Sequence, residues 1–261
     1  MKWISIAKFR SLTLVMLLLL AVSIAPAMAS KAEATTCSAM QDDMHKTDLT
    51  GIEKNTAVSV ALNIKDVNTL SNGLKSADIQ SIVDGARVFS MEKRGTDGSV
   101  ISLTSVVLPT EVISQNGDSV DISNVVAVWD NKTSRVMRYT LHYENKILRD
   151  ITFSRVGDNG EIVSSQVYHE GVFSSDLSGG FYSPDSTYTY WSCVSVCIGT
   201  GCICGLTGVP CPPGTAPGCG ICYTLCSGCV ASGGVIVELC IACGACLGVD
   251  LGYCMGHCWG Q

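Results

Sequence analysis

The 261-residue chain carries a formal net charge of −6 and 15 cysteines, and its length allows one large domain or two small ones. All 17 Lys and Arg residues lie at or before Arg155, so the remainder has only acidic formal charges. This distribution argues against nucleic-acid binding by the C-terminal part, because contacts with phosphate require cations.

The N-terminal segment has the parts of a secretory signal peptide. Its cations are Lys2, Lys8 and Arg10. An uncharged apolar run over residues 12–25 follows, and Ala27 and Ala29 provide a signal-peptidase site. We therefore expect a signal peptide over residues 1–29, cleaved before Ser30, and Sec-type export to the extracellular space. The alternative is an uncleaved membrane anchor, although the run is short for a bilayer span.

Residues 30–173 are predicted to form an α+β domain, an antiparallel sheet with one short helix. Residues 30–55 are polar, which predicts a loose mature N-terminus that can hold one short helix. Alternation over Val58–Leu62 predicts a first strand, and Ser76–Ala86 has the apolar spacing of a helix opened by a Ser cap. Further strands, separated by turn signals such as Asp130-Asn131-Lys132, are expected at Val100–Leu108, Val120–Trp129, Arg135–Tyr143, Ile147–Val156 and Ile162–Tyr168. We expect one face of this sheet to be polar.

Residues 174–190 interrupt this pattern with Ser, Gly, Pro and Asp and contain no apolar stripe. Such a composition predicts a linker and a place where a processing protease acts. The alternative is a surface loop between two permanently joined domains.

Residues 191–261 are predicted to form a small, mainly helical, disulfide-rich module. A segment this short buries little surface, so it needs crosslinks, and thiols persist as disulfides outside the reducing cytosol. We expect disulfides at Cys193, Cys197, Cys202, Cys204, Cys211, Cys219, Cys222, Cys226, Cys229, Cys240, Cys243, Cys246, Cys254 and Cys258.

The cysteine spacings of three and four residues place pairs on one face of a helix. Two antiparallel helices joined by such rows would be linked Cys193–Cys258 and Cys197–Cys254, one pairing among on the order of 10⁵. The alternative is a metal site. Cys240-x-x-Cys243-x-x-Cys246 begins like an iron–sulfur motif, but Asp250 stands where the fourth ligand belongs. Two other C-x-x-C pairs, which begin at Cys219 and Cys226, have the spacing of a four-thiolate zinc site.

The run Val230–Val249 is long enough for a transmembrane helix, but Glu238 lies near its centre and several positions are Gly or Ser. We favour a buried central helix of the module, with partition into a target membrane as the alternative.

No nucleophile–base motif predicts catalysis, so we expect no enzyme activity and no cofactor. Cys37 with His142 or His169 could form a thiol–imidazole pair, but no flanking motif accompanies them. A second alternative is a cation site formed by the carboxylates of Asp121, Asp130 and Glu144, although their spacing matches no loop template.

Three segments of the tail resemble the halocin C-eight-like bacteriocin precursors. They are Cys193-Val-Ser-Val-Cys197, Gly201-Cys-Ile-Cys-Gly-Leu-Thr-Gly208 and Cys229-Val-Ala-Ser-Gly-Gly-Val-Ile-Val-Glu-Leu-Cys240. The resemblance implies that the tail is released as a microbicidal peptide and that the upstream region serves as its propeptide or immunity domain. This tail departs from the founding peptide in having more cysteines and no Lys or Arg.

We therefore expect a secreted bacteriocin-like precursor whose partners are a target-cell envelope or membrane and, for the tail, its own N-terminal domain. The alternatives are a secreted cell-surface or interaction protein with a structural disulfide knot, and a thiolate metal-binding protein.

Overall fold

The computed structural model describes residues 44–71, 83–94, 98–115, 119–170, 172–173, 190–191, 193–194, 197–198 and 219–260. The predicted signal peptide lies outside the described residues, and so does its cleavage site at Ala27, Ala29 and Ser30. The same is true of Cys37 and of residues 174–189 of the predicted linker.

The described strands form one antiparallel sheet in which each strand pairs with its neighbour in sequence, in the order β1 to β8. Their bounds are β1 Met44–Asp48, β2 Arg87–Arg94, β3 Val100–Gln115, β4 Ser119–Trp129, β5 Ser134–Glu144, β6 Ile147–Val156, β7 Ile162–His169 and β8 Val172–Phe173. The predicted α+β class is confirmed, and the five strands expected between residues 100 and 168 are present. Four of them lie within a residue or so of their expected bounds, whereas β3 runs on to Gln115, well beyond the expected end at Leu108.

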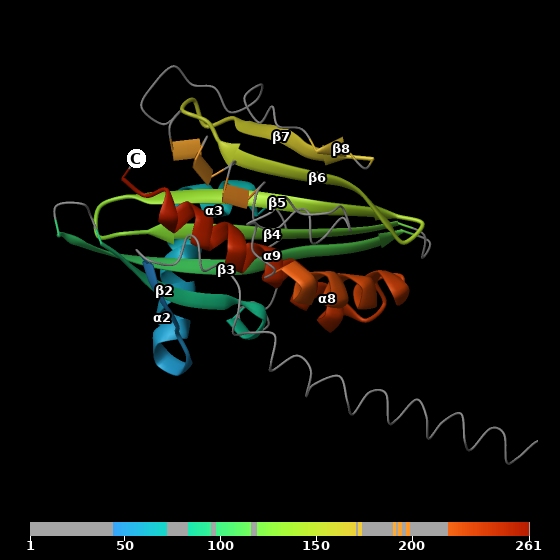
Figure 1. Cartoon of the computed structure of the whole chain (residues 1–261), viewed down its shortest axis with the longest axis horizontal. Helices are drawn as coiled ribbons and strands as arrows, with labels where there is room; N and C mark the ends of the chain where they lie inside the picture. The colour runs from blue at the N-terminus through green and yellow to red at the C-terminus, as the bar shows by residue number, and fades with distance from the viewer. Residues whose placement is uncertain are drawn as a thin grey trace, which may run out of the picture. The chain divides into compact units, whose positions relative to one another are not determined.

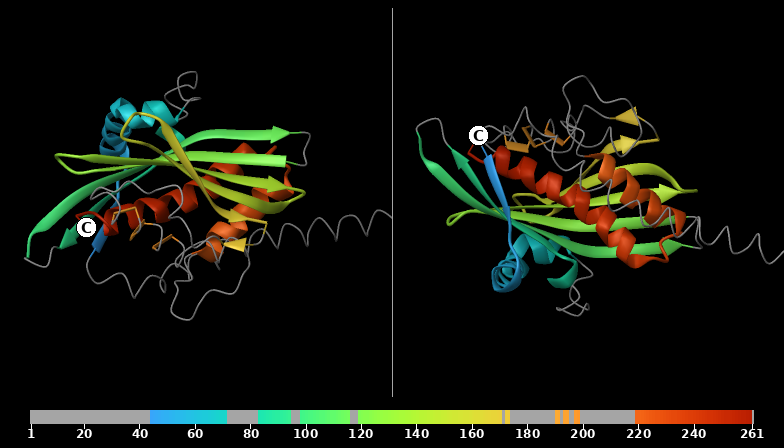
Figure 2. Two further views of the ribbon diagram at one scale, coloured as in Figure 1. Left: turned by 90° about the horizontal axis from the view of Figure 1, so that it is seen from above. Right: turned by 60° about the horizontal axis from the view of Figure 1, so that its bottom comes forward.

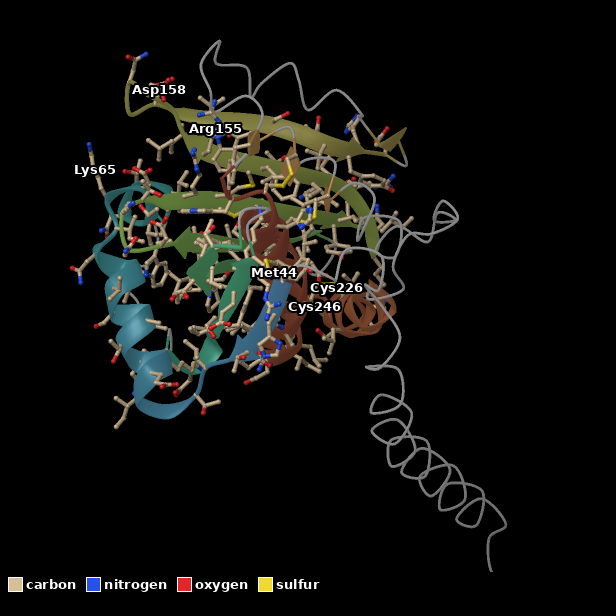
Figure 3. All side chains as sticks on the ribbon, turned by 60° about the vertical axis from the view of Figure 1, so that its left-hand side comes forward. Met44, Lys65, Arg155, Asp158, Cys226 and Cys246 are labelled. Carbon is tan, nitrogen blue, oxygen red and sulfur yellow. A yellow bond between two sulfur atoms is a disulfide. The ribbon has the colours of Figure 1, made fainter. Side chains whose placement is uncertain are left out.

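The helices that accompany the sheet include α2 Gly51–Asn63, α3 Lys65–Leu70, α8 Cys219–Ala231 and α9 Val237–His257. Figures 1 and 2 show α9 lying across one face of the sheet and α2 on the other. In Figure 3, Lys65 on α3 and Cys226 on α8 are likewise on opposite sides. The two faces bury separate apolar clusters, one with α9 and one with α2 and α3.

Three predictions about the first 95 residues are wrong or incomplete. Val58–Leu62 is part of helix α2, because Ala57, Val58 and Ala61 share one helical face, which is buried against the sheet. Residues 44–48, expected to be loose, form edge strand β1, whose mostly exposed side chains give no apolar alternation. Strand β2 was not predicted, because its buried residues include the adjacent Val88 and Phe89. The predicted helix Ser76–Ala86 lies mostly outside the described residues.

The expectation of one polar face holds for only part of the sheet. Along β4, Val125 to Val128 are all buried, because α9 covers one side of the strand and α2 and α3 help to cover the other. Polar side chains that remain partly exposed, such as Asp121 and His142, lie near the start of β4 and the end of β5.

Helix α9 approaches the sheet closely because glycine recurs every fourth residue on the side that faces it. We call Gly244, Gly248, Gly252 and Gly256 the glycine face. A Cβ atom at Gly248 would overlap Val107 and lie 2.9 Å from Tyr139 Oη, and one at Gly256 would lie 2.7 Å from Met91 Sδ. Residues four apart lie on one side of a helix, so all four glycines meet the strands together.

We expect Gly248→Ala to lower the stability of the folded protein, although Ala normally favours a helix over Gly. The added methyl group would clash with Val107 and Tyr139, and such overpacking typically costs about 1–3 kcal/mol. The urea midpoint of the oxidised chain measures this. Gly228→Ala on α8 is the matched control, since its Cβ meets only the end of Leu239, at 3.3 Å. Equal midpoints for the two variants would contradict the close packing.

Candidate functional site

Disulfides link the described parts of the cysteine module. Cys193 is bonded to Cys258 and Cys197 to Cys254, the two pairings that helical spacing predicted. Two further bridges, Cys226–Cys243 and Cys229–Cys240, join α8 to α9. All four follow one pattern, in which cysteines three or four apart on one segment meet cysteines three or four apart on an antiparallel partner. These bridges indicate an extracellular or secreted protein.

The other predicted disulfide positions have different outcomes. Cys246 is disulfide-bonded as well. The side chains of Cys202, Cys204, Cys211, Cys219 and Cys222 lie outside the described residues.

The thiolate metal sites considered from the sequence lose ligands to these bridges. Cys240, Cys243 and Cys246, which begin like an iron–sulfur motif, are all disulfide-bonded, and so are Cys226 and Cys229. A cysteine in a disulfide has no thiolate to offer a metal ion.

The apolar run Val230–Val249 is not one helix. Helix α8 ends at Ala231, and Gly233 and Gly234 adopt positive φ angles of 64° and 79° in the turn before α9 begins at Val237. The predicted bounds of the buried central helix are therefore wrong, because the buried helix is α9, which begins at Val237 and ends at His257. By length and composition one described stretch, Glu238–His257, is apolar enough to cross a membrane, and 61% of its most apolar window is buried inside the molecule.

Charged residues of the sheet contact the C-terminal end of α9 or the aromatic residues Tyr190 and Trp191, and we call these residues the clamp: Lys93, Asp130, Arg135 and Arg155. They stand at the end of β2, after β4, at the start of β5 and near the end of β6. In an antiparallel meander the ends of β2, β4 and β6 lie beside the start of β5, so all four residues are at the same end of the strands. The topology therefore gathers four residues that are up to 62 positions apart in sequence, which is the separation of Lys93 and Arg155.

The clamp contacts three aromatic residues, Tyr190 at the end of the predicted linker and Trp191 and Trp259 of the tail, which we call the aromatic cluster. The Tyr190 ring meets Trp191 and Trp259 edge to face, with centroids 4.8 and 6.1 Å away. Arg135 lies over the Tyr190 ring, 4.3 Å from its centroid, and Arg155 lies 5.9 Å from the centroid of Trp191. Cations over aromatic faces are attracted by the ring quadrupole. Burial raises the pKa of Tyr190, whose hydroxyl donates to Met255 O at 3.1 Å.

Lys93 and Asp130 bind the C-terminal end of α9 directly. Lys93 Nζ donates to the carbonyl oxygens of His257 and Trp259 at 2.5 and 2.7 Å. A cation at this end satisfies carbonyls that lack a partner within the helix and complements the helix dipole. Asp130 Oδ2 accepts a hydrogen bond from Trp259 Nε1 at 3.2 Å, while its Oδ1 accepts from the backbone N–H groups of Lys132 and Thr133.

Beneath the middle of α9 the sheet presents polar groups to the glycine face. The hydroxyl of fully buried Tyr139 donates to Gly244 O, and burial raises its pKa well above the ordinary value. Asn124 and Ser105 are also fully buried, and their side-chain atoms have no hydrogen-bond partner among the described residues. They lie opposite Gly244 and Gly252.

The residues considered for catalysis or cation binding are dispersed. His142 Nδ1 is hydrogen-bonded to Asp121 Oδ1 at 2.5 Å, and His169 Nδ1 to Asp150 Oδ1 at 2.6 Å. Glu144 pairs with Arg149, at the end of β5 opposite Asp130. The structure does not bring Asp121, Asp130 and Glu144 together. Among the described residues, no three His, Cys, Asp or Glu side chains are grouped so that they could hold a metal ion.

The sequence prediction missed the glycine face, the clamp and the aromatic cluster. A signal for the first existed, since Gly244, Gly248, Gly252 and Gly256 are evenly spaced. The clamp had no local signal, because strand order gathers it. No family model, curated protein or solved structure matches this chain.

We expect acid to loosen the contact between Asp130 and Trp259. Burial opposes the charged carboxylate, but hydrogen bonds from Thr133, Lys132 and the indole outweigh it and lower the pKa of Asp130 from 3.8. A lowered pKa means that this stabilisation is present above pH 3.8 and is lost as the pH falls through the lower folded value. Hydrogen exchange of the Trp259 indole N–H should accelerate in that window. Asp130→Asn keeps an acceptor but cannot titrate, so its exchange should lack this step.

We also expect His169 to titrate above its ordinary value of 6.5. The hydrogen bond to Asp150 is the main cause of the raised pKa. Since the folded pKa is raised, the pairing stabilises the fold fully below pH 6.5 and is lost as the pH rises through the folded value. NMR titration should show the pKa returning toward 6.5 in Asp150→Asn and unchanged in Asp66→Asn, a carboxylate on α3. An ordinary pKa in the unaltered chain would contradict the pairing.

Proposed function

We propose that this chain is a secreted bacteriocin-like precursor whose tail is the antimicrobial part. The observation that carries the proposal is the pairing of a disulfide-stapled helical module with a sheet that covers its apolar helix α9. Buried residues of α9, such as Leu247 and Leu251, share one cluster with Phe89 and Tyr139 of the sheet. Covering that surface is what a propeptide or immunity domain would do, and the resemblance to halocin C-eight-like precursors supports the same roles.

The bridges are consistent with release of the tail by one cut upstream of Tyr190. Cys193–Cys258 and Cys197–Cys254 bond the start of the tail to its end. A cut in residues 174–189 would thus leave a module that stays covalently closed at both ends. We propose Sec-type export with removal of residues 1–29, and action on a competitor's envelope by an apolar surface instead of by bond chemistry.

We expect killing to depend on the cut and on the sheet. A site for a specific protease placed within residues 174–189 allows uncut and cut protein to be compared on growing related cells. Uncut protein should be inactive, and the tail separated from the sheet after cutting should inhibit growth and cause membrane leakage. Reduction of the separated tail should abolish this effect, because about seventy residues cannot hold their fold without staples.

A sheet variant provides the matched control for the covering role. Val107 already packs closely against Gly248, so Val107→Phe crowds α9 and weakens its contact with the sheet, while every residue of the tail stays unchanged. Cut protein with this substitution should kill better than cut wild type, provided that peptide mapping finds the same bridges in both. Absence of inhibition by the separated, oxidised tail at micromolar concentration contradicts the proposed function.

A second candidate is a secreted interaction protein in which tail and sheet remain joined. The shared apolar cluster favours it, because the described residues of both the sheet and the tail belong to one compact unit. Mass spectrometry of the culture medium distinguishes the two: the second candidate requires a product that runs from Ser30 to Gln261, and the first requires a separate tail fragment.

A further inference from the structure

We propose that the sheet has a second function, as a folding template that selects the two long-range disulfides of the tail, Cys193–Cys258 and Cys197–Cys254. This function concerns how the bridges form, and it does not depend on any killing activity.

The four described bridges divide into two kinds by loop length. Cys226–Cys243 and Cys229–Cys240 close loops with sequence separations of 17 and 11, whereas Cys193–Cys258 and Cys197–Cys254 have separations of 65 and 57. Because the probability of loop closure falls roughly as the −3/2 power of length, the longest of these loops closes about 14-fold less readily than the shortest. The two long-range pairs also compete with many other cysteines in the tail.

The short-range pairs are set by the hairpin itself. Gly233 and Gly234 take positive φ angles in the turn, and Gly234 N–H donates to Cys229 O at 3.1 Å. Ser232 Oγ donates to the same carbonyl oxygen at 2.6 Å. This local turn brings Cys229 opposite Cys240 and needs nothing from the sheet.

The longer of the long-range pairs, Cys193–Cys258, is instead flanked on both sides by contacts with the clamp, and Cys197–Cys254 lies within the loop that this pair closes. Arg135 and Arg155 hold Tyr190 and Trp191, which precede Cys193 by three and two residues. Lys93 and Asp130 hold the backbone and the indole of the residues on either side of Cys258. The sheet thus binds both ends of the loop that runs from Cys193 to Cys258, and it does so at one end of its strands. The Cα atoms of the two cysteines are 5.8 Å apart.

The glycine face fixes the rotation of α9 that this pairing needs. Cys254 and Cys258 follow Gly252 and Gly256 by two residues, which is about 200° around an α-helix. When the glycines lie on the sheet, these cysteines point away from it, toward the segment that carries Cys193 and Cys197. A Cβ at Gly252 would overlap Ser105, so other rotations of the helix cannot approach as closely.

The chemistry is thiol–disulfide exchange with an external disulfide of a small-molecule or protein thiol. A tail thiolate first displaces one thiol of the oxidant and forms a mixed disulfide, which the partner cysteine thiolate then attacks, releasing the second thiol. In each bridge two cysteine thiols are oxidised and one external disulfide is reduced to two thiols, which take up the two protons. The sheet supplies no electrons; it sets which thiolate reaches which mixed disulfide.

The test is oxidative refolding of the full chain from the reduced state, with glutathione and glutathione disulfide as the redox pair. Acid-quenched samples are mapped by proteolysis and mass spectrometry, which follows each bridge separately. The double variant Lys93→Met/Arg135→Met removes two clamp cations. Arg94→Met is the matched control, because this neighbour of Lys93 is an exposed cation at the same strand end.

We expect the double variant to form Cys226–Cys243 and Cys229–Cys240 at the wild-type rate, and Cys193–Cys258 and Cys197–Cys254 about tenfold more slowly and with mispaired products. Arg94→Met should behave as wild type. Equal rates for all four bridges in every chain would overturn the proposal. Equal slowing of all four in the double variant would overturn it as well, because that indicates general destabilisation.

A milder pair of variants guards against a double variant that fails to stay soluble. Trp259→Phe removes the indole donor to Asp130 and keeps a ring in the aromatic cluster, while Trp129→Phe changes a tryptophan that packs against the other face of the sheet. Selective slowing of the long-range bridges by Trp259→Phe alone supports the template. The same effect from both variants, or from neither, counts against it.

Discussion

The close approach of α9 to the sheet is the contact on which the rest of the structure depends. It exists because four glycines, one per helical turn, leave the line of closest approach to β2, β3 and β4 without side chains, while leucines such as Leu247 and Leu251 pack beside it. Glycine in a helix interior is unfavourable by roughly 1 kcal/mol relative to alanine, so such a helix is weak by itself. The bridges to α8 and to Cys193 and Cys197 compensate, since they hold α9 from its other side. Packing on the sheet and crosslinking within the tail are therefore complementary solutions to the stability of one helix.

The uneven distribution of charge acquires a structural meaning through the clamp. The tail has no Lys or Arg, and in the part of the chain that the structure describes the carbonyls at the end of α9 and the faces of Tyr190 and Trp191 receive their cations from the sheet. Charge and apolar packing thereby specify different things. The apolar cluster provides area without direction, whereas Lys93, Asp130 and the two arginines fix the register of the helix along the sheet, because hydrogen bonds and cation–π contacts are lost within a small displacement.

The sequence predicted what local patterns encode and missed what strand order creates. The strands from Val100 to Tyr168, the stapled module and two disulfide pairings followed from alternation, turn residues and helical spacing of cysteines. Strands β1 and β2 did not, because the first is an exposed edge and the second is buried on both faces. The clamp could not be predicted from local patterns, since Lys93 on β2 and Arg155 on β6 reach the tail from the same side of the sheet only when the whole meander is in place. Helix α2 was mistaken for a strand because Val58, Val60 and Leu62 also alternate.

The surface beneath α9 bears on whether tail and sheet are permanent partners. A permanent core contains few unpaired polar groups, because leaving a buried donor or acceptor unsatisfied costs about 1–3 kcal/mol. Here Asn124 and Ser105 are fully buried against Gly244 and Gly252 without a hydrogen-bond partner among the described residues. Removal of α9 would expose both side chains to water and recover that cost. A sheet face that becomes better solvated when its helix leaves is suited to a reversible cover, which favours the precursor over the permanently joined alternative.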